Sequence, residues 1–111
     1  MNDIFTSGSW KANPGSEEAF VEAWTEFATW TSTLPGVGAL HLLRDLDEPG
    51  RYLSFADWES PADAERWKSG PDFRERLAHI LQHVADFKAS EYAAAVTAEA
   101  GASATPARTA A

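Results

Sequence analysis

The spacing of hydrophobic residues divides the first half of the chain into predicted strands and one long helix. Residues 4–12 and 51–58 contain β-forming residues without a helical period, so each is predicted to be a strand. Residues 37–46 form a further strand-like, mostly apolar segment. After Ser16, a typical helix cap, apolar residues recur every three or four positions until Pro35, which predicts an amphipathic helix. Its apolar face consists of Phe20, Ala23, Trp24, Phe27, Trp30, Thr31 and Leu34.

The second half is predicted to contain two helical pieces and a last strand. Ser60 and Pro61 are typical of a helix start, and a short helix is expected from there to Trp67. A second helical piece is expected over residues 72–87, and residues 90–97 are expected to form a strand. The apolar face of the second piece consists of Phe73, Leu77, Ile80, Leu81, Val84 and Phe87.

This order of elements, β-α-β-β-α-β, predicts a ferredoxin-like α+β fold: an antiparallel four-stranded sheet with helices on one face. Residues 1–97 are expected to form this domain. Residues 98–111 are rich in alanine and lack periodicity, which predicts a disordered tail. Gly8, in the middle of the first strand, marks either a bulge or a place where another group approaches the backbone closely.

The predicted strand 51–58 carries apolar side chains on both of its faces. Leu53 and Phe55 lie on one face, and Ala56 and Trp58 lie on the other. Two helices can cover only one face of a four-stranded sheet. We therefore expect the other face to pack against a second copy of the chain, in a two-fold homodimer.

Composition and charge narrow the possible functions. The chain has 111 residues and no cysteine, which excludes disulfides, thiol chemistry and cysteine-bound metals. Its 17 acidic and 9 basic residues give a formal net charge of −8, which argues against nucleic acid and against an anionic membrane surface as partners. No apolar run is long enough to span a bilayer, and the first residues lack the features of a secretory signal. A cytoplasmic location is the resulting expectation.

Several short segments, taken in order, resemble one protein family. The segment Leu43-Arg44-Asp45-Leu46-Asp47-Glu48-Pro49-Gly50-Arg51-Tyr52 is followed by Trp58-Glu59-Ser60 and then by Ser69-Gly70-Pro71-Asp72-Phe73. With Leu34-Pro35-Gly36, these segments resemble the antibiotic biosynthesis monooxygenase (ABM) domain family over roughly residues 4–97. The resemblance implies a dimeric α/β barrel with a pocket between the sheet and the helices of each protomer. Some members oxidise anthrones and related aromatic molecules with O₂, some degrade haem, and others act on quinols or other small molecules.

The quinone-forming members suggest which residues could be catalytic. They share an Asn-x-x-x-Trp motif on the third strand, and the matching positions here are Ser54 and Trp58. The resemblance implies that the Trp58 indole and the Ser54 hydroxyl stabilise negative charge on a substrate oxygen. His41 is the only histidine on the predicted sheet and is a candidate general base. This chemistry uses neither metal nor flavin, so no cofactor is expected.

The haem-degrading members provide a second comparison. They share an asparagine in the first strand, a tryptophan in a helix and an axial histidine, and the matching positions here are Gly8, Trp67 and Leu77. Leucine cannot ligate iron, so haem binding or degradation is the less favoured alternative. Trp67, Phe73, Leu77 and Gly8 are instead expected to line a pocket for a small hydrophobic or aromatic molecule.

Other interpretations of these residues stay open. His79 and His83 lie one turn apart on a predicted helix, a spacing that can bind zinc, but the residues between them do not match a metalloprotease motif and no metal is expected. The five tryptophans can be core residues, provided that each buried indole N–H finds a partner. The expected function is a cofactor-independent monooxygenase acting on a polyketide- or quinol-like aromatic substrate. The alternative is a non-catalytic dimeric barrel that binds a small hydrophobic ligand.

Overall fold

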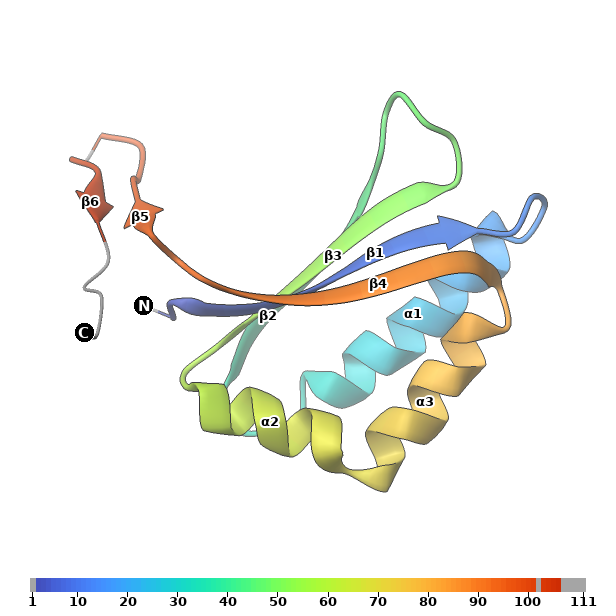
Figure 1. Cartoon of the computed structure of the whole chain (residues 1–111), viewed down its shortest axis with the longest axis horizontal. Coiled ribbons are helices and arrows are strands. Elements are labelled where there is room, and N and C mark those ends of the chain that lie inside the picture. The colour runs from blue at the N-terminus through green and yellow to red at the C-terminus, as the bar shows by residue number, and fades with distance from the viewer. Residues whose placement is uncertain (1, 102, 107–111) are drawn as a thin grey trace.

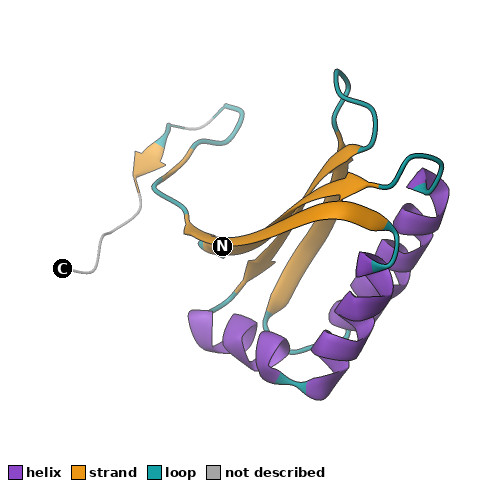
Figure 2. Ribbon diagram, turned by 45° about the vertical axis from the view of Figure 1, so that its right-hand side comes forward, coloured by secondary structure: helices purple, strands orange, loops and turns teal. Residues whose placement is uncertain are grey.

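The computed structural model describes residues 2–101 and 103–106, and its main body consists of a sheet layer and a helix layer (Figures 1 and 2). Four antiparallel strands lie in the order β2-β3-β1-β4, and the helices cover one face of the sheet. The elements are β1 Ile4–Ala12, α1 Glu17–Thr31, β2 Val37–Arg44, β3 Arg51–Trp58, α2 Pro61–Ser69, α3 Pro71–Leu81 and β4 Val84–Ala93. This arrangement confirms the ferredoxin-like α+β fold.

The C-terminal part of the prediction needs a correction, because α3 ends at Leu81 rather than near Phe87, and the last strand begins at Val84. Val84 pairs with Ala12 while Asp86 pairs with Lys11, so β4 carries an extra residue at this point. Such a β-bulge sets two inward-facing positions three residues apart instead of two. Val84 and Phe87 therefore both pack against the core with a spacing that imitates a helix.

The chain continues past β4 into a short pair of strands. β5 Val96–Thr97 pairs with β6 Thr105–Pro106, and this pair projects away from the main sheet (Figure 1). The segment overlaps the predicted tail of residues 98–111, of which residues 102 and 107–111 lie outside the described residues. The described part of this segment thus includes one strand, β6.

Local signals explain where the helices begin. The backbone N–H of Asp63 donates to Ser60 Oγ at 3.2 Å, and Pro61 occupies the first position of α2, as the sequence predicts. Gly70 separates α2 from α3. Among the residues that the structure describes, no helix combines the length and apolarity that spanning a bilayer requires.

The main core lies between the helices and the sheet. The predicted inner face of α1 is confirmed, with Phe20, Ala23, Trp24, Phe27 and Thr31 buried. These side chains meet a cluster that includes Trp10 and Tyr52 from the sheet and Ile80 from α3. Aromatic rings make up much of this contact: the Phe20 ring centroid is 5.5 Å from that of Trp10 and 4.8 Å from that of Tyr52. The core therefore joins both layers through tightly packed rings.

The opposite face of the sheet has no helix over it (Figure 2). Large apolar side chains are accessible there in the single chain: Leu43 is 49% exposed, Leu53 is 40% exposed and Tyr92 is 56% exposed. Leu43 and Leu53 lie directly opposite each other on β2 and β3, so they form one apolar patch rather than scattered positions. We call this surface the outer sheet face.

The loop between β2 and β3 is organised by the Asp45 carboxylate. Asp45 Oδ1 accepts hydrogen bonds from the backbone N–H groups of Asp47 at 2.8 Å and Glu48 at 3.0 Å. These two bonds hold the pKa of Asp45 below its ordinary value of 3.8, because they favour the charged form. The Glu48 carboxylate contacts Lys11 at 3.2 Å and Arg51 at 3.3 Å, which lowers the pKa of Glu48 as well.

Acid should loosen this loop only at low pH. A carboxyl whose pKa is lower in the folded state stabilises that state above its unfolded pKa, and the contribution is lost as the pH falls through the folded value. In an NMR titration we expect the Asp45 carboxyl to titrate below its ordinary value, with the amide signals of Asp47 and Glu48 shifting at the same midpoint. Asp45→Asn should remove that shared transition. A midpoint for Asp45 at or above its ordinary value would contradict this account.

Candidate functional site

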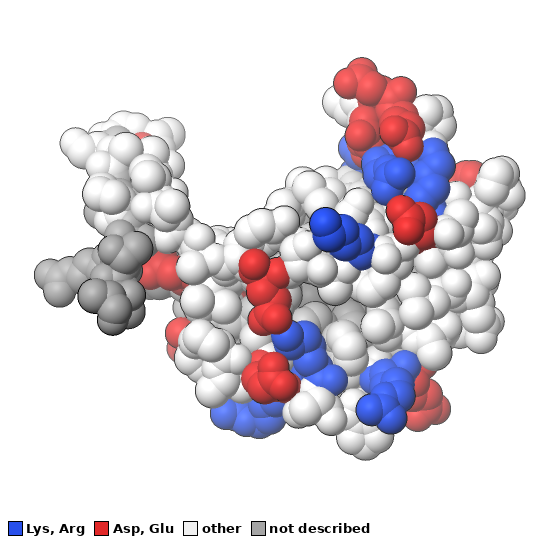
Figure 3. Space-filling view, viewed as in Figure 1, with Lys and Arg blue, Asp and Glu red and all other residues white. Residues whose placement is uncertain are grey.

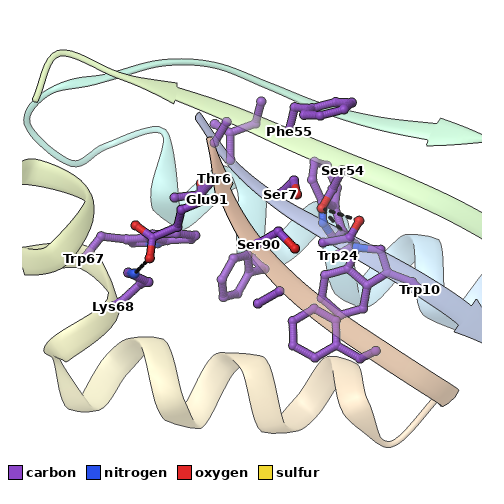
Figure 4. Close-up of a pocket in the computed structure, with 16 residues that line it drawn as sticks. Thr6, Ser7, Trp10, Trp24, Ser54, Phe55, Trp67, Lys68, Ser90 and Glu91 are labelled. Carbon is purple, nitrogen blue, oxygen red and sulfur yellow. Dashed lines mark hydrogen bonds and ion pairs between the residues drawn. The ribbon is translucent and has the colours of Figure 1, made fainter. Parts of the chain in front are cut away.

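A cavity of about 140 Å³ lies between the inner face of the sheet and the helices. Figure 4 shows the side chains around it, which come from all four strands of the main sheet and from α1 and α2. Aromatic rings form much of its wall, namely those of Trp10, Trp24, Phe27, Trp67 and Phe87. The polar side chains that line it include Thr6, Ser54, Lys68 and Glu91. An apolar hollow with a few polar groups is the usual form of a small-molecule site.

Two buried hydroxyl groups on the cavity wall are each held by an indole. Trp10 Nε1 donates to Ser54 Oγ at 3.0 Å, and Trp58 Nε1 donates to Thr6 Oγ1 at 3.0 Å. All four residues are buried. Because each hydroxyl accepts from an indole N–H, its own proton is available to donate elsewhere. We call these two contacts the indole–hydroxyl pairs.

The register of β1 and β3 produces both pairs. Gly8 lies opposite Ser54, and Trp10 is two residues further along the same strand. Thr6 lies opposite Ala56, and Trp58 is two residues further along β3 in the same way. Each pair is therefore a diagonal contact between antiparallel strands, with the long indole reaching the hydroxyl on its neighbour.

Gly8 makes the first pair possible. A Cβ atom at this position would lie 2.7 Å from Trp10 Nε1 and 2.8 Å from Trp10 Cε2. The group that approaches the backbone closely at this glycine, as the sequence suggests, is therefore the indole of Trp10. Gly8 lines the cavity through its backbone, and its lack of a side chain allows Trp10 to lie flat and reach Ser54.

Trp58 requires a correction to its expected position. The sequence suggests a free indole donor in the pocket, but Trp58 is fully buried and does not line the cavity. Its N–H is already bonded to Thr6, so Trp58 reaches the cavity only through that hydroxyl. Ser54 lines the cavity.

Of the helix residues expected in the pocket, one lines the cavity and two do not. Trp67 lines the cavity and donates from Nε1 to Thr31 Oγ1 at 3.1 Å. Phe73 packs edge-on against Trp67, with ring centroids 4.7 Å apart, and does not line the cavity. Leu77 also packs against the main core, away from the cavity wall. Phe73 and Leu77 therefore support the wall from behind.

Histidine side chains lie away from the cavity. His41 is exposed and lies opposite Phe55 on the outer sheet face, so the sheet lies between His41 and Ser54. This position corrects the expectation that His41 acts as a general base in the same pocket as Ser54. The rings of His79 and His83 have centroids 5.8 Å apart. Within residues 2–101 and 103–106, no group of three or more histidine, cysteine or acidic residues is arranged to hold a metal ion.

An ion pair lies at the edge of the cavity where α2 faces β4. Lys68 Nζ is 2.6 Å from Glu91 Oε2, and both residues line the cavity (Figure 4). Glu91 is opposite Thr6 on the neighbouring strand, which places it on the inner side of the edge strand β4. On the surface drawn in Figure 3, acidic and basic side chains lie next to one another rather than in separate patches.

Sequence reasoning missed most of the residues that line the cavity, among them Thr6, Trp10, Trp24, Lys68 and Glu91. Thr6 and Trp10 could have been found, because they alternate with Gly8 along the first strand and so share its face. Glu91 could not have been found, because it lies inside the predicted strand of residues 90–97 but the alanine-rich pattern there does not show which side chains face the helices. Lys68 follows Trp67 directly, but nothing in its sequence context separates it from an ordinary surface lysine.

Comparison with known proteins places this geometry in context. A family model described as "Antibiotic biosynthesis monooxygenase" matches residues 4–79, which is more than half of the chain. A structure of SnoaB, a cofactor-independent oxygenase from Streptomyces nogalater, aligns with a TM-score of 0.78 and 17% identity, over 85% of this chain and 94% of that one. A conserved protein from Methanosarcina mazei aligns with a TM-score of 0.76 and 13% identity, over 84% and 93% of the two chains. At such identities these structures support the fold. Comparison with curated proteins gave no significant match.

Proposed function

The chain belongs to the antibiotic biosynthesis monooxygenase family, and from this premise we propose that it oxidises a small aromatic substrate with O₂ in the cavity between sheet and helices. The observation that carries the proposal is the presence of the two indole–hydroxyl pairs at a largely apolar cavity. The proposed substrate class is an anthrone-like or quinol-like molecule. The structural likeness to SnoaB, a cofactor-independent oxygenase, is consistent with this class.

The proposed reaction takes all of its electrons from the substrate. An activated ring CH₂ group reacts with O₂ to give a ring carbonyl and one water molecule, so one oxygen atom enters each product. The substrate first loses a proton to water, and its oxygen then carries the negative charge of an enolate. The enolate passes an electron to O₂, and the resulting radicals combine before water is lost. The protein's task is to stabilise the enolate oxygen and to exclude competing reactions.

Ser54 is the proposed donor to that oxygen. Its Oγ accepts from Trp10 Nε1 at 3.0 Å, and its proton otherwise faces the Gly8 carbonyl at the long distance of 3.4 Å. A ligand oxygen can replace this long contact at little cost. The hydrogen bond from Trp10 strengthens the serine as a donor, because bonds in a chain polarise one another. In this way Ser54 and the Trp10 indole together take the role of the asparagine side chain that the quinone-forming members have at the position of Ser54.

Thr6 and Trp58 are proposed to act as a second pair of the same kind. The Thr6 hydroxyl accepts from Trp58 and lines the cavity on the neighbouring strand. Trp58 is then a positioning residue rather than a direct donor. His41 has no part in this scheme within one protomer, because it lies on the outer sheet face.

A homodimer built on the outer sheet face completes the proposal. The apolar residues Leu43, Leu53 and Tyr92 are partly accessible in the single chain, and no helix covers them. A second copy placed sheet against sheet would bury them on both sides of a two-fold axis. This arrangement leaves the cavity, on the other face of each sheet, free for substrate.

Turnover of an anthrone tests the proposed function. We expect the protein to accelerate O₂ uptake and quinone formation with dithranol, measured with an oxygen electrode and by absorbance. Ser54→Ala should lower kcat/KM about tenfold, because one donor to the enolate oxygen is removed while the cavity keeps its shape.

Ser69→Ala is the matched control, since Ser69 is an exposed residue at the end of α2 and does not line the cavity. Its kcat/KM should stay within about twofold of the unmodified protein. O₂ uptake no faster than in buffer, with several anthrones and quinols, would refute the enzymatic proposal and favour the binding-only alternative. A Ser54→Ala rate equal to that of the control would refute the role of Ser54.

A further inference from the structure

One indole N–H in the cavity wall has no hydrogen-bond partner among the residues that the structure describes. The N–H groups of Trp10 and Trp67 donate to Ser54 and Thr31. Trp24 also lines the cavity, from the inner face of α1, but its N–H makes no hydrogen bond to any other residue in the described parts of the chain. Trp24 as a whole is 9% exposed, so most of this residue is removed from bulk water.

A buried donor without a partner is unfavourable, so proteins nearly always satisfy one. In the described residues no fully buried side-chain nitrogen or oxygen lacks a partner, so the Trp24 nitrogen keeps some accessible surface. An accessible indole N–H, on a residue that is otherwise buried and lines a cavity, can donate to a molecule that enters the cavity.

We propose that the Trp24 indole N–H selects ligands that carry a hydrogen-bond acceptor on the ring, namely a ketone, enolate or phenolate oxygen. The inference rests on the proposed function, because it uses the same cavity. It adds which chemical group of the substrate the cavity recognises. It assigns to α1 a recognition role separate from the indole–hydroxyl pairs of the sheet.

The other polar groups of the cavity interior favour the same class of ligand. Thr6 and Ser54 each accept from an indole, so their protons can donate to a ligand, that of Ser54 in exchange for its long 3.4 Å contact with the Gly8 carbonyl. The carboxylate that lines the cavity, Glu91, is engaged by Lys68 at 2.6 Å. The interior therefore offers donors, and it would leave them unsatisfied around a plain hydrocarbon.

The size of the cavity sets how much of the ligand it can hold. About 140 Å³ is close to the volume of protein cavities that enclose a single aromatic ring. An acceptor-bearing ring would occupy this space next to Trp24, and any further ring would extend toward the Lys68–Glu91 ion pair at the edge. A bicyclic ketone is thus a suitable probe.

Binding of two matched probes tests the proposal without turnover. 1-Tetralone and tetralin differ only in a carbonyl group in place of a CH₂ group, and calorimetry under argon gives the Kd of each. We expect Trp24→Phe to weaken the binding of 1-tetralone about tenfold and that of tetralin by less than about twofold. Phenylalanine keeps an aromatic ring at this position but lacks the indole N–H.

Trp30→Phe is the control, since Trp30 lies on the same helix, makes no hydrogen bond through its indole to the described residues and does not line the cavity. It should leave both Kd values unchanged. Equal losses for the two probes in Trp24→Phe would show a packing role and overturn the proposal, as would an unchanged Kd for 1-tetralone. If selective loss is found but dithranol is not oxidised, the proposed oxidation fails while this inference stands. If the unmodified protein binds neither probe, this inference fails, and the proposed oxidation is still decided by dithranol turnover alone.

Discussion

Replacing Gly8 with alanine is expected to lower the free energy of unfolding by about 3 kcal/mol and to abolish the Trp10–Ser54 hydrogen bond. The added Cβ would lie 2.7 Å from Trp10 Nε1, far inside normal contact, so the indole must move away from the strand. Moving it disturbs a buried ring that stacks on Phe87 at 4.2 Å and leaves Ser54 without its donor. Urea unfolding followed by circular dichroism measures the first effect, and the indole N–H signal of Trp10 in an NMR spectrum reports the second.

Gly70→Ala provides the matched control. Gly70 has an ordinary extended backbone conformation, and nothing lies within 4 Å of a Cβ atom built there. Its free energy of unfolding should change by less than about 0.5 kcal/mol. A double variant adds a sharper test: in a Trp10→Phe background, Gly8→Ala should cost clearly less, because the atoms that clash are absent. An equal cost in both backgrounds would show that Trp10 is not the reason for glycine at this position.

Leu53→Asp is expected to convert a dimer into a monomer, with the dissociation constant rising at least about 1,000-fold, or roughly 4 kcal/mol. Leu53 is 40% exposed in the single chain and lies beside Leu43 on the outer sheet face. In the proposed dimer an aspartate there would be buried without a partner, which is strongly unfavourable. Sedimentation velocity across a micromolar concentration range measures the change.

Leu46→Asp makes the same chemical change at a site outside that face. Leu46 follows β2 in the loop to β3 and is 94% exposed, so its substitution should leave the dissociation constant nearly unchanged. Circular dichroism of both variants separates dissociation from unfolding. An unmodified protein that sediments as a monomer at these concentrations would refute the proposed dimer.

The fold could be predicted wherever the hydrophobic spacing was regular. The strand Arg51–Trp58 follows from its β-forming residues and lack of a helical period, and the buried face of α1 follows from helical periodicity. The end of α3 could not be predicted, because one extra residue in β4 places Val84 and Phe87 three positions apart. At that spacing a bulged strand and a helix have the same hydrophobic pattern, and only the pairing with Ala12 distinguishes them.

The candidate site was predictable in its location but less so in its chemistry. Trp67, Ser54 and Gly8, which the sequence singles out, lie on the wall of the cavity. The partner of each indole N–H depends on diagonal contacts between strands. The register of β1 against β3 that creates these contacts cannot be predicted from the sequence. For the same reason Trp58, the expected donor, is bonded to Thr6, while Trp10 takes the contact with Ser54.

The two edge strands share a feature that bears on how the protein behaves at high concentration. β2 and β4 form the edges of the sheet, and each contains an extra residue relative to its neighbour, near Gly38 in β2 and near Ala85 in β4. A bulge interrupts the regular row of backbone N–H and C=O groups that another strand would need for pairing. Open-ended growth of the sheet into fibrils is therefore hindered at both edges, whereas the proposed two-fold contact on the outer sheet face would close after a single partner.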